Sequence, residues 1–375
     1  MQFRDLKTQY AALKPQIDEA IAQVLESSAF ILGKQVSELE TELAQYVGKK
    51  HCISCANGTD ALQLALMAWD VGPGDVVFTS DFTYFASAGS ASILGATIEL
   101  VDIDPRTFNM CPDALERAIQ RVLAEGKLNP KVIVPVDLFG LPADYDRIEA
   151  IAKKYSLKIL EDGAQGFGGN IQGKRACSFG DMATTSFFPA KPLGCYGDGG
   201  AIFTDDDEID ARLRSLRAQG KSPEDKYDNR EIGMNSRLDT LQAAILMPKF
   251  KAFVAYELDA VNRVAAWYTE RLKDTYITPY VPEGYYSSWA QYTLILESEA
   301  QRNQLQQRLK ENGIPSMVYY PRGLHQQKAY AEMQLTDEQY PNTAKATKTV
   351  LSLPMHPYLK EEDVDRIANV MLEKR

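Results

Sequence analysis

The sequence predicts an α/β protein with a large, mainly parallel β-sheet domain and a smaller α+β domain after it. A chain of 375 residues is too long for one ordinary hydrophobic core, which favours two domains. Strand-like and helix-like segments alternate from residue 51 to residue 205, as expected for right-handed crossovers between parallel strands. The pattern changes after residue 238, where longer helical segments begin.

The elements of the first domain follow from the hydrophobic pattern. Strands are predicted at "HCISC", "VVFTS", "TIELVDI", "KVIVPV", "LKILED", "ATTSFF" and "AIFT", and helices at "DALQLALMAW", "FASAGSASIL" and "DYDRIEAIAKKY". Several strands stop at a small or polar cluster, as in "CANGTD", "TSDFTY", "EDGAQGFGG" and "SFFPAKPLG". Ligands bind at the carboxyl ends of strands in open α/β sheets, so these clusters are candidate site segments.

The second half of the chain is predicted to begin with a long amphipathic helix from residue 238 to residue 274. We expect this helix to bend near Pro248, because proline lacks the amide that the helix ladder needs. A strand-like "WAQYTLIL", a charged helix "EAQRNQLQQRLKENG" and a terminal helix "EEDVDRIANVMLEKR" follow. We therefore predict a large domain at 1–245, including an N-terminal helical segment, and a small C-terminal domain at 246–375.

The composition excludes several classes of protein. The net charge is -10, which argues against nucleic-acid binding because that partner requires a basic face. No apolar run approaches the ~20 residues of a membrane helix, and "MQFRDLKTQY" is charged where a signal peptide is apolar. Five cysteines are an odd and sparse set that indicates reduced thiols, and the C-x-x-C of "HCISC" fits a strand better than a redox motif. We expect a cytoplasmic protein that contacts neither nucleic acid nor membrane.

The segment "ANGTDAL" is a candidate anion-binding turn. Gly58 and Thr59 open a predicted helix, where free backbone amides and the positive end of the helix dipole favour an anion. Asp60 would repel a phosphate unless its carboxylate turns away. A plain strand-to-helix turn capped by Asn57 explains this motif alone equally well.

Other motifs in the chain do not predict a site. Residues 168–174, "GGNIQGK", fit a P-loop pattern, but Arg175 follows where magnesium binding needs Ser or Thr. His51, His325 and His356 lack the spacing of metal ligands, and no G-x-S-x-G elbow indicates a hydrolase. We therefore expect no metal site, no nucleotide triphosphate site and no catalytic triad.

An acid and an amine on two other segments are expected to form one site with the anion-binding turn. Asp162 ends the strand "LKILED", and Lys191 lies in the proline- and glycine-rich loop "FFPAKPLGCYGDGG". A phosphate cradle, an acid against a pyridine nitrogen and an amine that forms a Schiff base are what pyridoxal phosphate requires. The order of these groups along the chain predicts pyridoxal 5'-phosphate as the cofactor.

The sequence resembles, over essentially its whole length, the sugar-nucleotide aminotransferases of the DegT/StrS type. The motifs that carry the resemblance are "NGTDAL", "VDIDPRTFNM", "EDGAQGFG", "SFFPAKPLGCYGDGGAIFT" and "GMNSRLDTLQAAIL". The resemblance implies an aspartate-aminotransferase-like fold of type I and a homodimer with shared active sites. It also implies that Lys191 forms the Schiff base and moves the proton, and that Asp162 keeps the pyridine nitrogen protonated.

The same resemblance implies further contacts with the cofactor. Gln165 matches the residue that hydrogen-bonds the ring hydroxyl, and Tyr84 matches the aromatic that stacks on the ring face. Gly58, Thr59 and Ser186 match the phosphate cradle.

The neighbouring subunit is implied to complete each site with two residues. Asn235 matches a residue that joins the phosphate cradle from the other chain, and Arg237 matches a substrate-side residue that reaches across the dimer.

The implied reaction is transamination of a nucleotide-linked keto sugar. Relatives that dehydrate sugars carry histidine where this chain has Lys191, so lysine favours a ping-pong transfer from an amino acid, with L-glutamate as the expected donor. "SLPMHPY" and the lysine segment resemble the subgroup that acts on UDP-2-acetamido-2-deoxy-3-oxo-glucuronate in surface polysaccharide (O-antigen) synthesis. Another keto position, or a dTDP- or GDP-linked sugar, stays open, as do a dehydratase and a regulatory protein on the same fold.

One departure from the family pattern concerns the substrate side. Tyr319, Tyr320 and Pro321 stand where many relatives read H-Y-P. Tyrosine in place of histidine keeps a hydrogen-bond donor but loses any positive charge, so Arg322 or His325 would have to meet a sugar carboxylate. We expect Tyr319, Tyr320 and His325 to lie on the substrate side, although Tyr320 and His356 could instead pack the domain interface.

Overall fold

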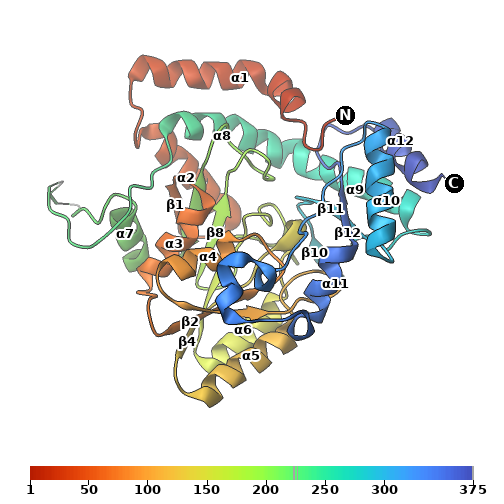
Figure 1. Cartoon of the computed structure of the whole chain (residues 1–375). Coiled ribbons are helices and arrows are strands. Elements are labelled where there is room, and N and C mark those ends of the chain that lie inside the picture. The colour runs from red at the N-terminus through yellow and green to blue at the C-terminus, as the bar shows by residue number, and fades with distance from the viewer. Residues whose placement is uncertain (223, 226, 374–375) are drawn as a thin grey trace.

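The large domain is built on one central β-sheet (Figure 1). The computed structural model describes residues 1–222, 224–225 and 227–373, and within them the central sheet has seven strands in the order β1-β9-β8-β5-β4-β2-β3. These strands are β1 (His51–Cys55), β2 (Asp75–Ser80), β3 (Thr97–Val101), β4 (Asn129–Val134), β5 (Lys158–Asp162), β8 (Met182–Ser186) and β9 (Gly200–Thr204). Each corresponds to one of the strands that the hydrophobic pattern predicts.

The pairing of the strands brings the candidate segments to one edge of the sheet. Neighbouring strands from β3 to β8 pair in parallel, whereas β9 pairs antiparallel with both β8 and β1. β1 therefore runs in the same direction as β8 and β5. Since parallel strands end at the same edge, the turn after β1, the end of β5 and the loop after β8 lie together. The prediction of a mainly parallel sheet is confirmed.

Helices cover both faces of the sheet. One face packs against α3 (Gly58–Ala68), α4 (Ala86–Ile93) and α7 (Asp207–Leu216). The other face packs against α2 (Lys34–Val47), α5 (Pro112–Glu125), α6 (Tyr145–Tyr155) and α8 (Thr240–Ala252). Val76 and Val77 of β2 belong to opposite cores, as the alternation of a strand requires. α5 and α7 are not among the predicted helices, although α5 has a clear apolar stripe.

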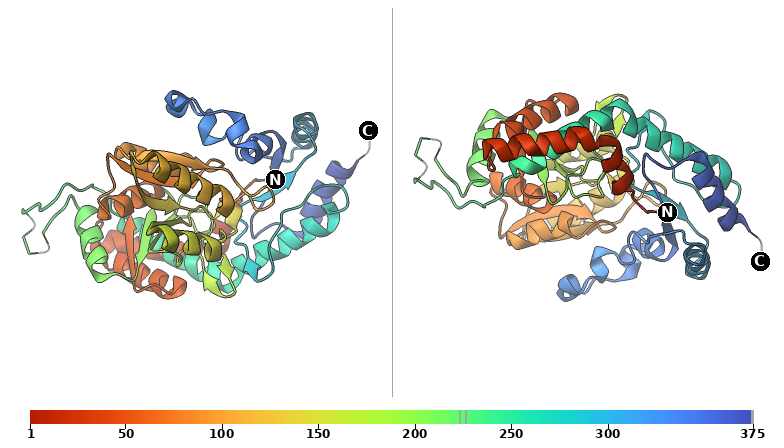
Figure 2. Two further views of the ribbon diagram at one scale, coloured as in Figure 1. Left: turned by 90° about the horizontal axis from the view of Figure 1, so that it is seen from below. Right: turned by 90° about the horizontal axis from the view of Figure 1, so that it is seen from above.

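The long predicted helix consists of α8, a π-helical turn η2 (Phe253–Glu257) and α9 (Leu258–Leu272). Pro248 lies inside α8, so the helix continues through the proline, and its hydrogen bonding becomes irregular only at η2, later than we expect from the sequence. α1 (Leu6–Ser27) and α2 both pack against α8, which holds the helix together across the missing amide. Figure 2 shows α1 lying along α8, with the N-terminus beside the C-terminal part of the chain.

A second core lies in the C-terminal part of the chain. β11 (Tyr292–Ile295) pairs antiparallel with β12 (Val350–Leu353), and α9, α10 (Glu299–Glu311) and α12 (Glu361–Leu372) pack around this pair. Phe253 belongs to a core of the large domain and Val261 to this second core, so the packing changes near η2. The division at 245/246 stays a prediction.

One part of the C-terminal half packs on the large domain instead of the second core. Leu324, Tyr330 and Tyr340 join the core that α3 and α4 form with the sheet. They belong to a run of short helices, η3 (Leu324–Gln326), η4 (Lys328–Met333) and η5 (Asp337–Gln339), that leads into α11 (Pro341–Thr349). This run closes over the large domain near its strand ends.

The discounted motifs have structural roles. "GGNIQGK" forms the hairpin of β6 (Asn170–Ile171) and β7 (Lys174–Arg175), which β10 (Tyr285–Tyr286) extends, so no helix follows it as a P-loop requires. Cys52 and Cys55 lie in cores on opposite faces of β1, and burial raises the pKa of both thiols, so they are packing residues. Among the described helices, none is long and apolar enough to span a membrane.

Candidate active site

The turn between β1 and α3 forms one wall of the site. Asn57 caps α3, and its Oδ1 accepts a hydrogen bond from the Asp60 amide at 2.8 Å. The cap does not compete with anion binding, because no acceptor in the described part of the chain reaches the amides of Gly58 and Thr59. Both amides stand at the positive end of the helix dipole, where a phosphate is favoured.

Close packing at this turn explains the glycine that opens α3. A Cβ on Gly58 would lie 2.6 Å from the Cβ of Ser186, and a Cβ on Gly200 would lie 2.5 Å from the carbonyl oxygen of Asn57. The ends of β8 and β9 therefore press against the start of α3. This contact brings the Ser186 hydroxyl next to the two free amides.

Asp162 ends β5, and its side chain is buried at the edge of the site. Ser87 Oγ, on α4, donates a hydrogen bond to Oδ2 at 2.7 Å, and the Ala164 amide donates to Oδ1 at 3.2 Å. Burial raises the pKa of Asp162, while the Ser87 hydroxyl, the Lys191 amine and the Ala164 amide oppose that rise. The carboxylate is thus held by donors and faces a cation.

Lys191 lies in the loop between β8 and β9, which backbone hydrogen bonds close. The Lys191 amide donates to the Phe188 carbonyl at 2.8 Å, and the Cys195 amide donates to the Phe187 carbonyl at 2.8 Å. Burial lowers the pKa of the Lys191 amine, and the Asp162 carboxylate partly offsets the effect. A lower pKa enlarges the fraction of neutral amine, which is the nucleophilic form.

The arrangement of these groups fits pyridoxal phosphate. Lys191 and Asp162 each shift the pKa of the other, yet no salt bridge joins them among residues 1–222, 224–225 and 227–373. The two groups therefore lie near each other without a direct bond, at the sheet edge where α3 also begins. An amine, an acid and an anion cradle in this order suit the aldehyde, the ring nitrogen and the phosphate of the cofactor. Across the same residues, no cluster of His, Cys, Asp or Glu is arranged to hold a metal ion.

Gln165 connects the large domain with the C-terminal segment. Its Oε1 accepts a hydrogen bond from the Phe139 amide at 2.9 Å, and its Nε2 donates to the Tyr320 hydroxyl at 3.1 Å. Tyr320 thus contacts Gln165, and its predicted place on the substrate side stays a prediction. Burial raises the pKa of the Tyr320 phenol, so its hydroxyl stays protonated at neutral pH.

Two other predicted aromatic residues are accessible. Tyr84 follows β2 and its side chain is 60% exposed, which leaves its ring free to stack on a planar ligand. Tyr319 is half-buried, and its ring contacts those of Phe3 and Tyr320 at centroid distances of 6.1 Å and 5.8 Å. Both positions allow the roles that the sequence predicts.

Asn235 and Arg237 lie on the segment between α7 and α8, part of which projects from the body of the molecule (Figure 1). Arg237 Nη2 donates a hydrogen bond to Asn235 Oδ1 at 2.6 Å, and Asn235 is exposed. Ser236 between them is buried and accepts a hydrogen bond from the Ala56 amide at 3.1 Å. In the described part of the chain, neither Asn235 nor Arg237 bonds to another predicted site residue. A role in the neighbouring subunit's site stays a prediction.

His325 occupies a buried ion-pair cluster. Its Nδ1 lies 2.6 Å from Asp81 Oδ2 and its Nε2 lies 3.0 Å from Asp337 Oδ1. Its ring stacks on Tyr340 at 4.9 Å, and its side chain is only 1% exposed. Burial lowers the pKa of His325, but the two carboxylates outweigh burial and raise it overall. This geometry favours a role in docking η3 onto the large domain over contact with a sugar.

Comparison with known proteins identifies the family. The chain matches the model of the DegT/DnrJ/EryC1/StrS aminotransferase family over residues 11–372. The chain belongs to this family. It is 48% identical over 360 residues to UDP-2-acetamido-2-deoxy-3-oxo-D-glucuronate aminotransferase from Pseudomonas aeruginosa, with 96% of each chain covered. It is 41% identical over 368 residues to UDP-N-acetyl-3-dehydro-alpha-D-glucosamine 3-aminotransferase from Acidithiobacillus ferrooxidans, with 98% of this chain and 96% of the relative covered.

Solved structures of the family share the fold. A DegT/DnrJ/EryC1/StrS aminotransferase from Brucella abortus superimposes with a TM-score of 0.96 at 46% identity, covering 99% of this chain and 98% of that one. A sugar aminotransferase from Streptococcus pneumoniae, solved in its PLP form, superimposes with a TM-score of 0.88 at 26% identity, covering 95% of each chain. The predicted α/β aminotransferase fold is confirmed.

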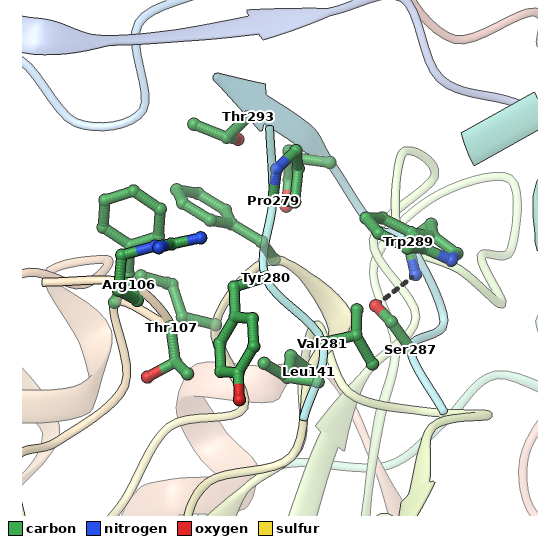
Figure 3. A pocket seen from close by; sticks show the side chains of 13 residues that line it. Arg106, Thr107, Leu141, Pro279, Tyr280, Val281, Ser287, Trp289 and Thr293 are labelled. Atoms are coloured by element: carbon green, nitrogen blue, oxygen red, sulfur yellow. Dashed lines mark hydrogen bonds between the residues drawn. The ribbon is translucent and has the colours of Figure 1, made fainter. Parts of the chain in front are cut away.

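A separate crevice is shown in Figure 3. Segments of the large domain and of residues 279–293 line it, and Arg106 lies over the ring of Tyr280 at 5.3 Å. Its cavity of about 20 Å³ holds no more than a single water molecule. Phe139 lines this crevice and also holds Gln165 through its amide. The crevice is therefore a packing defect at the domain junction and too small for a substrate.

Two residues of the site escape prediction from the sequence. Ser87 holds Asp162 from α4, and Phe139 holds Gln165 through its main chain. Ser87 follows Tyr84 by one helical turn, so a helical reading of "YFAS" places it on the same side as the predicted stacking residue. The contact of Phe139 leaves no mark in the sequence, because a backbone amide has no side-chain signature.

Proposed function

We propose that this chain transfers the amino group of L-glutamate to UDP-2-acetamido-2-deoxy-3-oxo-glucuronate, with pyridoxal phosphate as cofactor. One observation carries the reaction class: the Lys191 amine, with a lowered pKa, lies near the buried Asp162 carboxylate, at the sheet edge where the free amides begin α3. The identity of 48% to the Pseudomonas aeruginosa enzyme supports the sugar.

Each residue of the site has a distinct part in this reaction. Pyridoxal phosphate supplies an aldehyde that takes up nitrogen and a ring that accepts electrons. Lys191 Nζ attaches the cofactor and, once displaced by the amino donor, moves the proton between carbon atoms. Asp162 holds a proton on the ring nitrogen. Ser186 donates its hydroxyl to the phosphate together with the amides of Gly58 and Thr59.

Two further side chains orient the cofactor in this proposal. Gln165 bonds the ring hydroxyl, and its two hydrogen bonds to Phe139 and Tyr320 fix its amide plane. Tyr84 covers one ring face, for which its 60% exposure leaves it available.

The functional unit in this proposal is a homodimer in the cytoplasm. Asn235 and Arg237 serve the neighbouring site in this proposal, which fits the exposure of Asn235 and the lack, among the described residues, of bonds from either to any other predicted site residue. Free thiols at Cys52, Cys55 and Cys195 agree with a reducing compartment.

Complementation tests the shared site. Lys191→Ala and Arg237→Ala are each expected to lack activity, while a refolded mixture should recover about a quarter of wild-type activity, since half of the random dimers carry one intact site. A mixture that stays inactive, with hybrid dimers verified by mass spectrometry, would contradict sharing.

The central experiment follows the visible absorbance of the holoprotein. Borohydride should fix the cofactor on Lys191, and glutamate alone should convert the cofactor to its aminated form, which a keto sugar then discharges. Lys191→Ala should bind cofactor without a covalent bond and lose at least about 10³-fold in turnover. Water loss without an amino donor would indicate a dehydratase, and failure to bind the cofactor would indicate a regulatory protein.

The sugar is tested with two substrates that differ at one group. The glucuronate and glucosamine derivatives named for the two relatives differ by a carboxylate, so a preference for the first requires a cation in the site. Arg322 is exposed, two residues beyond Tyr320. Arg322→Gln should lower kcat/KM for the glucuronate by about tenfold, the effect of one charged hydrogen bond, and leave the glucosamine unchanged.

A further inference from the structure

Arg4, which precedes α1, reaches the loop that carries the active-site lysine. Its Nη2 donates hydrogen bonds to the carbonyl oxygen of Lys191 at 2.7 Å and to that of Pro192 at 3.2 Å. Among the described residues, no other donor reaches these two carbonyls. Arg4 therefore holds the lysine loop at a point where the loop cannot bond through its own backbone amide, because Pro192 has none.

The guanidinium of Arg4 is partly buried and forms no ion pair in the described part of the chain. Burial lowers the pKa of Arg4 to about 10, and the Glu257 carboxylate partly offsets this effect. Glu257 bonds instead with Gln9 Nε2 at 2.9 Å and with the Tyr358 hydroxyl at 2.6 Å. A cation that bonds only to main-chain carbonyls is costly to bury. The two hydrogen bonds of Arg4 fix the positions of the Lys191 and Pro192 carbonyls.

The residues beside Arg4 tie the same segment to the C-terminal half. The Met355 amide donates a hydrogen bond to the Phe3 carbonyl at 3.1 Å, and the Phe3 ring lies 6.1 Å from that of Tyr319. Tyr319 precedes Tyr320, whose hydroxyl bonds to Gln165 in the site. Residues 3–9, which we term the N-terminal strap, thus contact both the lysine loop and the segment that carries Tyr319 and Tyr320.

We propose that Arg4 is a positioning residue for Lys191: it fixes the carbonyls of Lys191 and Pro192 and thereby aims Lys191 Nζ at the cofactor aldehyde. Phe3 keeps the strap in register with the segment that carries Tyr319 and Tyr320. This inference rests on the proposed role of Lys191. Both bonds come from Nη2, so the two N–H groups of one guanidinium nitrogen hold two successive carbonyls.

A double-mutant cycle separates positioning from general stabilisation. The dissociation constant of pyridoxal phosphate is measured for wild type and Arg4→Met, and again for both in the Lys191→Ala background. Arg4→Met should weaken binding about tenfold when Lys191 is present, the effect of one charged hydrogen bond. In the Lys191→Ala background it should have no effect, since no amine remains to be aimed. Arg4→Lys should fall between Arg4→Met and wild type, because an ammonium keeps the charge and the N–H donors but lacks the planar guanidinium that orients them.

Gln9→Met is the matched control. It removes a buried hydrogen bond to Glu257 from the same strap without touching the loop. It should lower the unfolding temperature and leave the dissociation constant of the cofactor unchanged. Equal weakening by Arg4→Met in both backgrounds, or none in either, would overturn the inference. If Arg4→Met does not fold, Arg4→Lys is run through the same cycle. A Lys191→Ala protein that still binds the cofactor covalently would overturn the proposed function instead.

Discussion

The two carboxyl groups that end β5 are neighbours in sequence and have opposite surroundings. Asp162 receives hydrogen bonds from Ser87 and Ala164 and faces the Lys191 amine. Glu161 receives hydrogen bonds from the amides of Cys177 and Phe179 on the other side of the strand. Alternation along the strand sends one side chain into the site and the other into the core.

Glu161, which points into the core, lies against a second acid, Asp137, whereas Asp162 lies near the Lys191 amine. Glu161 and Asp137 face each other, both are fully buried, and Asp137 Oδ2 has no donor among the described residues unless Glu161 carries a proton. Burial raises the pKa of both, that of Asp137 to about 7. Burial thus raises the pKa of Asp137, Glu161 and Asp162 alike, and the group opposite each carboxyl decides which of them keeps its negative charge.

The largest effect is expected from removing the negative charge of Asp162. Asp162→Asn keeps the shape but loses the anion, and should lower kcat/KM by about 10³-fold with little change in unfolding temperature. Glu161→Gln places an amide group against a backbone N–H, and should lower the free energy of unfolding by about 1–3 kcal/mol with little change in kcat/KM. Steady-state kinetics and urea unfolding of both variants check the contrast. Similar losses of activity in the two would refute it.

A fourth carboxylate, Asp81, sharpens the comparison because its facing group is the imidazole of His325. His325→Leu should lower the free energy of unfolding by about 3 kcal/mol, since it leaves the buried Asp81 unpaired. The double variant Asp81→Asn with His325→Leu should regain part of this loss. Urea unfolding measures both, and an unchanged free energy in His325→Leu would show that the pair does not dock η3.

The shared proton predicts a dependence of stability on pH. Asp137 and Glu161 share a proton in the folded chain, where the pKa of Asp137 is raised to about 7, whereas an unfolded aspartate has a pKa of about 3.9. The contribution of this proton to the free energy of unfolding is complete below about pH 4 and is lost as the pH rises through about 7. Asp137→Asn can donate to Glu161 without a shared proton, so its free energy of unfolding should fall less between about pH 5 and 8. Urea midpoints across this range test it, and parallel profiles would contradict a shared proton.

The smallest effect is expected at the two adjacent tyrosines. Tyr320→Phe removes the hydrogen bond to Gln165 and should weaken pyridoxal phosphate binding by about 1 kcal/mol. Tyr319→Phe removes a hydroxyl that we propose to lie on the substrate side, and should change only KM for the sugar. Cofactor titration and sugar kinetics of both variants distinguish the positions. Weaker cofactor binding in Tyr319→Phe would contradict the assignment.

Local patterns in the chain were enough to place every strand of the central sheet and the three cofactor-binding segments. Strand periodicity and glycine turns depend on neighbouring residues, so "NGTDAL", Asp162 and Lys191 are recognisable before any folding is considered. The sequence predicts a bend near Pro248, whereas the irregular turn η2 begins a few residues later, because α1 and α2, distant in sequence, support α8.

The sequence by itself determined the fold class, the family and the order of phosphate turn, acid and amine. Only the tertiary structure decided that Tyr320 reaches Gln165, that His325 pairs with Asp81 and that Arg4 holds the lysine loop. Each of these contacts joins residues more than 150 positions apart. Spacing along the chain encodes which residues share a helix face or a strand end, whereas a contact between distant segments depends on how the completed cores pack.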